Sequence, residues 1–350
     1  MSEESRIALL VTDPTNIRYL TGFIGAAPEE REAYVLVTPN QTYLFTNALY
    51  IEQAKKLFKK PVVIQISREN PLSKELATLC TKLHINDIGF EDVNLTVAEL
   101  TKLKQVLSDI TLTPMRNSIE KKREIKSTTE IEFIRKASHI TDECFTHILS
   151  KLKPGVTEAE IAWEMQTFFR KNDATDAFSP IVAYNSNASM PHYMPGSVQL
   201  TPNSLILMDY GARYRGYCSD MTRVVFLGKP KDEWVKGYAA VLEAQSVALN
   251  ALEHNERSGK VLDELSQSIL KKHNLPAYPH SLGHALGLDI HESPRLSRTQ
   301  DSSLKPNMVI TIEPGVYIEN SYGVRIEDTV LIGEDSIEIL TQSPKEITVL

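Results

Sequence analysis

Along the first third of the chain, stretches with the residue pattern of β-strands alternate with stretches that have the apolar spacing of α-helices. Four stretches rich in β-branched and aromatic residues, bounded by turn residues, predict strands: "SRIALLVTD", "EAYVLVTP", "QTYLFTN" and "PVVIQIS". Three others have apolar residues at helical spacing: "LYIEQAKKLF", "PLSKELATLCTKL" and "TVAELTKLKQVL". "HINDIGFED" indicates the start of one more strand. This alternation predicts a small α/β domain that ends near Pro114.

A second domain is indicated by a helix start signal after a charged segment. Ser127 and Glu130 have the spacing of a capping box, in which each side chain binds the backbone of the other. One helix face follows at steps of three and four residues: Phe133, Ala137, Ile140 and Cys144. We therefore expect domains at residues 1–118 and 119–350.

The second domain combines helices with strands in hairpins. A second capping box, Thr157 to Glu160, opens the helix "EAEIAWEMQTFFRK". Two further helices are predicted at "KDEWVKGYAAVLEAQSVALNAL" and "GKVLDELSQSILKKH". The strands are expected in "LMDYGARYRGYCSDMTRVVFLG", "LGLDIHES", "NMVITIEPGVYI" and "GVRIEDTVLIG". Grouped helices beside hairpins predict an α+β domain with a curved antiparallel sheet.

Composition narrows the class of protein. The chain has 350 residues, of which 42% are hydrophobic, and its net charge of −7 argues against a nucleic-acid partner. Its three widely spaced cysteines indicate neither a disulfide framework nor a cysteine zinc site. The N-terminus does not resemble a signal peptide, and no apolar run approaches 18 residues. We expect a cytoplasmic protein with no membrane contact.

Two aspartates stand in the apolar hairpin at residues 207–228. If the turn lies between Tyr214 and Arg215, Asp209 and Asp220 are directly opposite each other. Two like charges directly opposite each other on paired strands repel, and a divalent cation between them would turn that repulsion into attraction. The alternative is that either aspartate is an ordinary strand-end or turn residue.

Two glutamates repeat the pattern further along. Glu313 in "VITIEPG" and Glu327 in "GVRIED" each follow an apolar β-branched residue. They are opposite each other if the hairpin loop has an odd length and centres on Asn320. Solvent-facing glutamates are the alternative, which the apolar neighbours Ile312 and Ile326 disfavour.

Histidines complete the candidate donor set. Of nine histidines, five lie in helical or connecting segments, where we expect ordinary polar roles: His84, His139, His147, His254 and His273. The others lie in "MPHYMPG" and "PHSLGHALGLDIHESP": His192, His280, His284 and His291. His280 and His284 have helical zinc spacing, but Pro279, Gly283 and the lack of a following glutamate disfavour that motif.

The donor set indicates a metal-dependent hydrolase. Four carboxylates with at least one imidazole suit Mn²⁺ above all, with Co²⁺ or Zn²⁺ also compatible. Four negative charges balance two divalent ions, as in two-metal hydrolases.

The ordered set Asp209, Asp220, His284, Glu313 and Glu327 resembles the metal ligands of the pita-bread metallopeptidases. This family includes methionine aminopeptidase, aminopeptidase P and prolidase. The strings "MDYGARYRGYCSDMTR", "SLGHALGLDIHE", "TIEPGVYI" and "GVRIEDTVL" carry the resemblance. "NIRYLTGF" resembles the creatinase-like N-terminal domain of the prolidase branch. The resemblance implies a C-terminal pita-bread fold, an N-terminal creatinase-like domain and an Xaa-Pro aminopeptidase that acts on peptides with proline at the second position.

The resemblance also implies a role for each ligand. Asp209 would chelate one metal ion, and Asp220 and Glu327 would bridge both. His284 and Glu313 would bind the second ion, and Glu313 would also take a proton from the attacking water.

Further residues match the family outside the metal ligands. His192 and His291 match histidines that contact the substrate and the tetrahedral intermediate. His280 matches a histidine that lines the pocket, and Arg325 matches an arginine hydrogen-bonded near Asp220. The candidates for the proline pocket are Tyr193, Tyr317 and Arg295.

Three alternatives stay open. A dipeptidase specific for Xaa-Pro needs a cation for the free carboxylate of its substrate, and Arg295 would supply it. A metal-free binding module and a metal-free hydrolase of the creatinase type are disfavoured, because the full ligand set would then have no purpose. By analogy with relatives that carry this N-terminal domain, we expect a homodimer.

Overall fold

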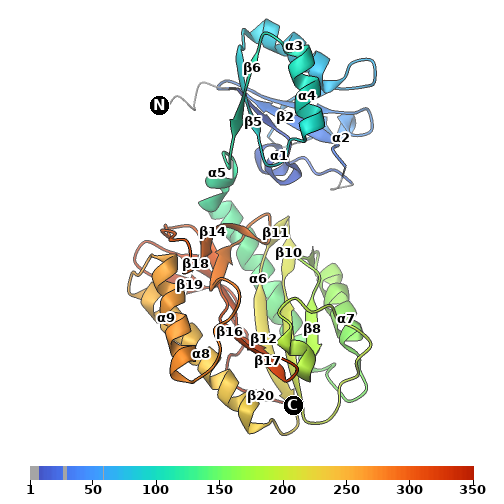
Figure 1. Ribbon diagram of the computed structural model, residues 1–350. Coiled ribbons are helices and arrows are strands. Elements are labelled where there is room, and N and C mark those ends of the chain that lie inside the picture. The colour runs from blue at the N-terminus through green and yellow to red at the C-terminus, as the bar shows by residue number, and fades with distance from the viewer. Residues whose placement is uncertain (1–7, 27–29, 58) are drawn as a thin grey trace. The chain divides into compact units, whose positions relative to one another are not determined.

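The computed structural model describes residues 8–26, 30–57 and 59–350 (Figure 1). The chain forms two compact units, one that ends at Lys122 and one that comprises Arg123–Leu350. The sequence predicts a boundary at residue 118, a few residues earlier. No helix of the described ranges is long and apolar enough to cross a membrane.

The first unit is a six-stranded mixed sheet with helices. The strands run in the order β4-β3-β2-β1-β5-β6. Their bounds are β1 (Ala8–Val11), β2 (Ala33–Val37), β3 (Thr42–Thr46), β4 (Val62–Gln65), β5 (Asp87–Glu91) and β6 (Thr111–Met115). The helices are α1 (Pro14–Thr21), α2 (Ile51–Lys55), α3 (Leu72–Leu83) and α4 (Val97–Val106).

The expected elements of this unit are all present, and two others were not expected. The first residues of "SRIALLVTD", 5–7, lie outside the described ranges. Helix α1 begins at Pro14, with the Asp13 side chain accepting from the Asn16 N–H, and it ends at Thr21, followed by the cap residue Gly22 with φ 81°. These are ordinary helix signals, but they enclose only eight residues, too few for a clear apolar period. Strand β6 contains Pro114, which disfavours a strand unless it lies at a sheet edge, as β6 does.

The second unit contains longer helices and a sheet in several pieces. Helix α5 (Glu120–Glu124) spans the division between the units, and the longer helices are α6 (Thr128–Leu149), α7 (Glu158–Lys171), α8 (Asp232–Glu253) and α9 (Gly259–Lys272). The early strands are β7 (Thr175–Asp176), β8 (Ile181–Tyr184), β9 (Ser204–Tyr210), β10 (Ala212–Tyr214), β11 (Tyr217–Cys218) and β12 (Met221–Leu227). The later strands are β13 (Gly283–Ala285), β14 (Glu292–Leu296), β15 (Val309–Ile312), β16 (Gly315–Ile318), β17 (Tyr322–Arg325), β18 (Asp328–Ile332), β19 (Ile337–Ile339) and β20 (Thr348–Val349). Both predicted capping boxes are confirmed, at Ser127 and Thr157.

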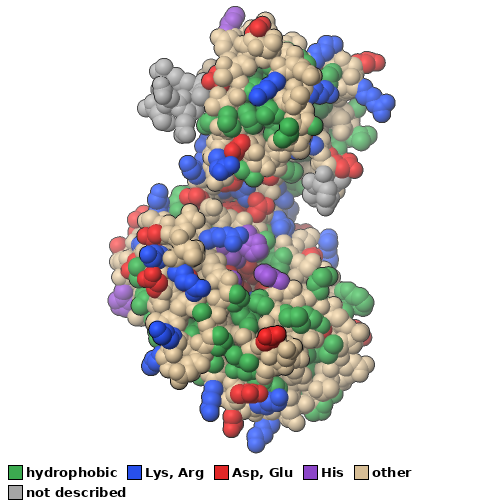
Figure 2. Space-filling view, in the orientation of Figure 1, with side chains coloured by type: hydrophobic (Ala, Val, Ile, Leu, Met, Phe, Trp, Pro, Cys, Tyr) green, Lys and Arg blue, Asp and Glu red, His purple; other side chains and the backbone are tan. Residues whose placement is uncertain are grey.

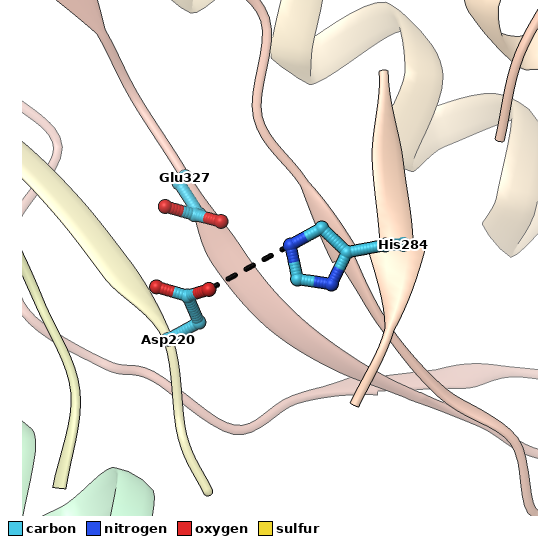
Figure 3. A group of neighbouring side chains, drawn as sticks. All are labelled: Asp220, His284 and Glu327. Carbon is cyan, nitrogen blue, oxygen red and sulfur yellow. Dashed lines mark ion pairs between the residues drawn. The ribbon is translucent and has the colours of Figure 1, made fainter. Parts of the chain in front are cut away.

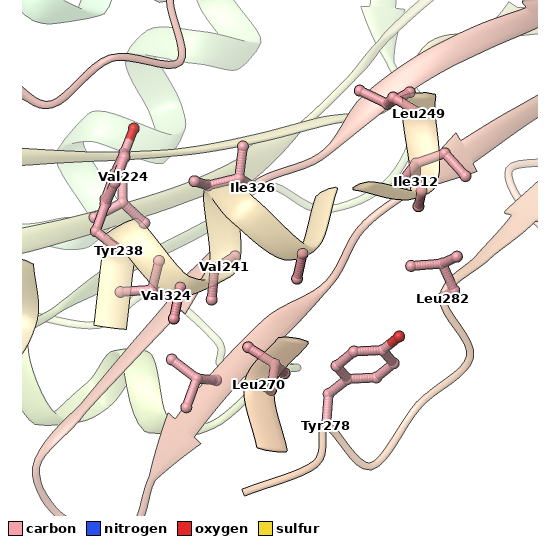
Figure 4. Close-up of a cluster of buried hydrophobic side chains, with 14 of the residues drawn as sticks. Val224, Tyr238, Val241, Leu249, Leu270, Tyr278, Leu282, Ile312, Val324 and Ile326 are labelled. Atoms are coloured by element: carbon pink, nitrogen blue, oxygen red, sulfur yellow. The ribbon is translucent and has the colours of Figure 1, made fainter. Parts of the chain in front are cut away.

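The alternation of strand residues decides which side chains reach the interior of the second unit. In β9, Ile206 and Met208 pack in the cluster that contains α6 and α7, whereas Leu205 and Leu207 pack in the cluster that contains α8. Asp209 shares the face of the second pair, because every other residue of a strand lies on one face. The same alternation places Glu313 opposite the face that Ile312 buries against α8. Figure 4 shows this cluster, with Val224, Ile312 and Ile326 around the helix.

The first predicted hairpin register was wrong by one residue at its turn. Asp209 pairs with Thr222, not with Asp220. The two-residue loop is Arg215–Gly216, with φ of 51° and 95°, because a tight hairpin loop needs left-handed backbone that glycine adopts readily. Asp220 therefore lies diagonally from Asp209, on the same face of the sheet.

The second hairpin has the register, left open by the sequence, that centres its loop on Asn320. Ile312 pairs with Asp328 on one side of the two glutamates, and Gly315 pairs with Arg325 on the other. Glu313 and Glu327 lie opposite each other between these pairs. The hairpin closes beyond the pair Ile318 and Tyr322, and the loop centres on Asn320 with φ 55°.

The strand predicted at "LGLDIHES" was wrong for most of its length. Residues 286–291 form a loop between β13 and β14. The Glu292 carboxylate, whose side chain is 7% exposed, accepts from the Asp289 N–H and from the buried Arg123 and Lys126 side chains. Because Arg123 and Lys126 are distant in sequence, the residues near Glu292 show no sign of these contacts. The apolar pattern at residues 286–291 alone therefore wrongly predicts a strand.

Candidate metal centre

Three buried side chains from three parts of the sheet converge on one point. Asp220 precedes β12, His284 is the middle residue of β13, and Glu327 precedes β18. One ligand atom from each lies within 4.8 Å of the other two. Figure 3 shows the imidazole pointing toward the two carboxylates, with Nε2 of His284 3.7 Å from Oδ2 of Asp220.

The two other predicted ligands border the same space. Oε1 of Glu313 lies 3.4 Å from Nε2 of His284. Asp209 and Glu313 line, together with the first three residues, a cavity of about 450 Å³. Figure 2 shows histidine side chains gathered around a hollow with acidic side chains inside it. The structure thus brings together all five residues that the sequence assigned to metal.

His284 offers a lone pair, not a proton, to these carboxylates. Its Nδ1 lies 3.1 Å from the carbonyl oxygen of Ala285, so Nδ1 carries the hydrogen. Burial lowers the pKa of His284 to about 3, so the ring is neutral near pH 7. Nε2 carries no hydrogen and therefore cannot donate to the nearby oxygens of Asp220 and Glu313, which are acceptors as well. A cation between them would satisfy all of these groups.

The negative charges of the carboxylates are not fully balanced by the side chains that the structure describes around them. Burial and the neighbouring Glu327 raise the pKa of Asp220 well above its usual range, and burial and Asp209 raise the pKa of Glu327 to about 8. Among the described residues, Oδ1 of Asp209 and Oδ1 of Asp220 are buried without a hydrogen-bond partner. Unpaired acceptors, crowded negative charge and a neutral imidazole fit divalent metal ions.

Arg325, which the resemblance places near Asp220, is hydrogen-bonded to Asp209 on the same face of the sheet. Its guanidinium donates to Oδ2 of Asp209, to Oγ1 of Thr222 at 2.9 Å and to the Tyr317 hydroxyl at 2.8 Å. Thr222 in turn donates to Oε2 of Glu327 at 2.6 Å. Thr222 was missed from sequence because the shifted register concealed that it faces Asp209.

His280 lines the cavity and is hydrogen-bonded to Tyr317 behind it. Nδ1 of His280 lies 2.8 Å from the Ser281 carbonyl oxygen and carries the hydrogen, so Nε2 accepts from the Tyr317 hydroxyl at 3.1 Å. Burial lowers the pKa of His280 to about 4. His280 lines the cavity directly, whereas Tyr317 contacts it through His280 and Arg325.

The remaining predicted residues lie at the mouth of the cavity. His192, His291, Tyr193 and Arg295 all line it, and both histidines are exposed. The ring centroid of His291 lies 4.5 Å from that of His284, with the rings nearly perpendicular. Apolar side chains that the sequence did not single out complete the wall, among them Phe178, Ile181, Met194 and Ile290.

Comparison with known protein families accounts for both units. Metallopeptidase family M24 matches residues 132–334, and the creatinase/prolidase N-terminal domain matches residues 1–125. An uncharacterised peptidase of Bacillus subtilis is 36% identical over 344 residues, which cover 98% of this chain and 95% of the relative.

Solved structures resemble the whole chain. An Xaa-Pro dipeptidase from Bacillus anthracis is similar with a TM-score of 0.91 and 33% identity, over 98% of this chain and 95% of that one. An X-Pro aminopeptidase from Thermotoga maritima is similar with a TM-score of 0.90 and 30% identity, over 99% of this chain and 98% of that one.

Proposed function

This chain belongs to metallopeptidase family M24, with the creatinase-like and pita-bread domains of that family, and on this basis we propose that it is an Xaa-Pro exopeptidase dependent on two divalent metal ions. One observation carries the proposal most: four carboxylates and a neutral imidazole border one cavity, with buried acceptor atoms that have no donor among the described residues. Mn²⁺ is the ion we expect, because the donors are mainly oxygen.

Each ligand has a proposed place. Asp209 would hold one ion, His284 and Glu313 the other, and Asp220 and Glu327 both. When bound, the ions would lower the pKa of an attacking water and polarise the scissile carbonyl.

The residues of the chain supply the rest of the chemistry. Glu313 would accept the proton of the attacking water, since its carboxylate borders the cavity beside His284. His291 and His192 at the mouth would donate hydrogen bonds to the developing oxyanion and to the substrate. Arg325 would fix the orientation of Asp209, whose Oδ2 it binds.

Substrate length divides the proposal into two candidates. The sequence favoured an aminopeptidase that removes the residue before proline from longer peptides. The position of Arg295 favours a dipeptidase, because this exposed cation lines the cavity and suits the free carboxylate of an Xaa-Pro dipeptide. Similar solved structures include proteins named for each activity.

A cleavage assay with metal analysis tests the common proposal. We expect the purified protein to contain divalent metal and to hydrolyse Xaa-Pro peptides, and a chelator to abolish this activity until Mn²⁺ is restored. Activity that survives in protein shown to be free of metal would contradict the proposal.

A second assay decides between the two candidates. Met-Pro is compared with Met-Pro-Ala and with Met-Pro amide, which lacks the free carboxylate. If Arg295 binds that carboxylate, Arg295→Ala raises the KM for the dipeptide and leaves the KM for the amide unchanged. Arg298→Ala is the matched control, since Arg298 is exposed nearby but does not line the cavity. Cleavage of the longer peptide with no effect of Arg295→Ala would favour the aminopeptidase.

A further inference from the structure

A buried carboxylate outside the metal cavity binds the segment that carries His192. Glu158 is the first residue of α7, and its side chain is 0% exposed. An ionised carboxylate is expensive to bury unless donors surround it. Its position is therefore explained only by what it contacts.

Among the described residues, the Glu158 carboxylate accepts four hydrogen bonds, all from one segment, residues 184–196. Oε1 accepts from the Tyr184 N–H at 2.8 Å and from Nδ2 of Asn187 at 2.9 Å. Oε2 accepts from the Tyr193 hydroxyl at 2.8 Å and from the Gly196 N–H at 3.2 Å. Both oxygens are thus used, and the donors lie on both sides of His192.

The backbone of the same helical turn binds the far end of the segment. The Ala159 N–H donates to the Gly196 carbonyl oxygen at 3.0 Å, and the Glu158 N–H donates to that of Val198 at 3.1 Å. At the near end, the segment leaves β8 at Tyr184. The chain between these anchors crosses the mouth of the cavity, which Pro191 to Pro195 line.

His192 depends on this anchoring because its own side chain is exposed at the cavity mouth. A shift of its backbone would move the imidazole away from the position where it can meet a substrate. Displacements of about 1 Å can reduce turnover by about 100-fold.

We propose that Glu158 is a positioning residue that fixes segment 184–196 and thereby places His192 over the metal cavity. The consequence for turnover rests on the proposed function, whereas the anchoring itself does not. A glutamine at this position would replace one carboxylate oxygen with an amide N–H₂, which cannot accept from the backbone N–H of Tyr184 or Gly196, so at least one of the four hydrogen bonds would be lost.

Glu160→Gln provides a matched control. Glu160 lies in the same first turn of α7, is exposed, and accepts from Thr157 in the capping box. Both substitutions remove one negative charge from the same helix terminus, but only Glu158 contacts segment 184–196.

Hydrogen–deuterium exchange on the full chain tests the anchoring without any activity. Glu158→Gln is expected to accelerate amide exchange in residues 186–197, whereas Glu160→Gln leaves it unchanged. Unchanged exchange in Glu158→Gln would overturn the inference. Should that variant fail to fold, Tyr193→Phe removes one donor to Glu158 and is expected to give a smaller acceleration in the same residues; no acceleration there would overturn the inference as well.

A double-mutant cycle tests the route to His192. Glu158→Gln is expected to lower kcat by about 10- to 100-fold, but by no more than about twofold in a His192→Ala background, because the effect then has nothing to act through. Equal losses in both backgrounds would overturn positioning through His192. If wild-type protein hydrolyses no Xaa-Pro peptide while Glu158→Gln still accelerates exchange, the proposed function fails and the anchoring stands.

Discussion

At the scale of single residues, Asp220 is expected to be needed for metal binding but not for the stability of the metal-free fold. Burial, followed by the neighbouring carboxylates of Glu327, Asp209 and Glu313, raises the pKa of its carboxyl. A neutral side chain of the same shape would relieve that repulsion.

We therefore predict that Asp220→Asn lowers kcat/KM by at least about 100-fold in the presence of Mn²⁺, since a proposed bridging ligand is lost. The Tm of the metal-free variant should equal or exceed that of the metal-free wild type. Calorimetry in chelator and a peptide assay measure the two effects. Asp232→Asn, at an exposed position, should change neither. Full activity in Asp220→Asn would exclude the bridging role.

A substitution of Arg325 tests whether its positive charge or its hydrogen-bond geometry orients Asp209. Arg325→Lys keeps the cation but loses the fork that reaches Asp209, Thr222 and Tyr317 together. We predict a 10- to 100-fold weaker binding of metal, measured by titration calorimetry with Mn²⁺. Arg298→Lys is the control. Wild-type affinity in Arg325→Lys would show that charge alone orients Asp209.

The sequence predicted the individual site residues better than their contacts. All five proposed ligands border one cavity. They could be predicted because carboxylates in apolar strands are unusual and stand out in the sequence. Thr222 was missed, and Arg325 was expected near Asp220 without its partner Asp209 being named. That omission follows from the hairpin register, because a shift of one residue in a turn changes every cross-strand partner.

At the scale of elements, the turn Arg215–Gly216 sets the register of the strands that carry both aspartates. Gly216 has φ 95°, where a Cβ is strained. Gly216→Ala is predicted to lower the free energy of unfolding by about 1–2 kcal/mol, measured by urea denaturation. Arg215→Asn should be neutral or stabilising, because asparagine tolerates the φ of 51° at that position. Equal stability of Gly216→Ala and wild type would exclude this role for the turn.

Helices were easier to predict than the loop at residues 286–291. Capping boxes and apolar spacing are local, so Ser127 and Thr157 indicated where α6 and α7 begin. The loop is instead fixed by Glu292, whose partners Arg123 and Lys126 are remote in sequence. Long-range ion pairs of this kind leave no periodic trace.

At the scale of the whole molecule, each unit has hydrophobic clusters of its own. Among the described residues, two clusters draw only on the first unit and three draw only on the second. The proposed ligands all belong to the second unit. We predict that residues 123–350 alone fold and retain divalent metal, measured by circular dichroism and elemental analysis. A folded fragment without metal would show that the first unit is needed for the site.

The full chain is expected to form a homodimer, as inferred from the family resemblance. Light scattering of the full chain measures its mass directly. A mass near the 39.3 kDa of one chain would refute this prediction.

The short loop at Asn320 has a consequence for how this chain can change in length. Because Ile318 and Tyr322 close the hairpin before the loop, residues added between them leave the pairing of Glu313 with Glu327 intact. An insertion within β16 or β17 would instead carry one glutamate out of register. Evolution, or an engineer attaching a fluorescent tag, can therefore lengthen the chain at Asn320 while the two acidic side chains stay opposite each other.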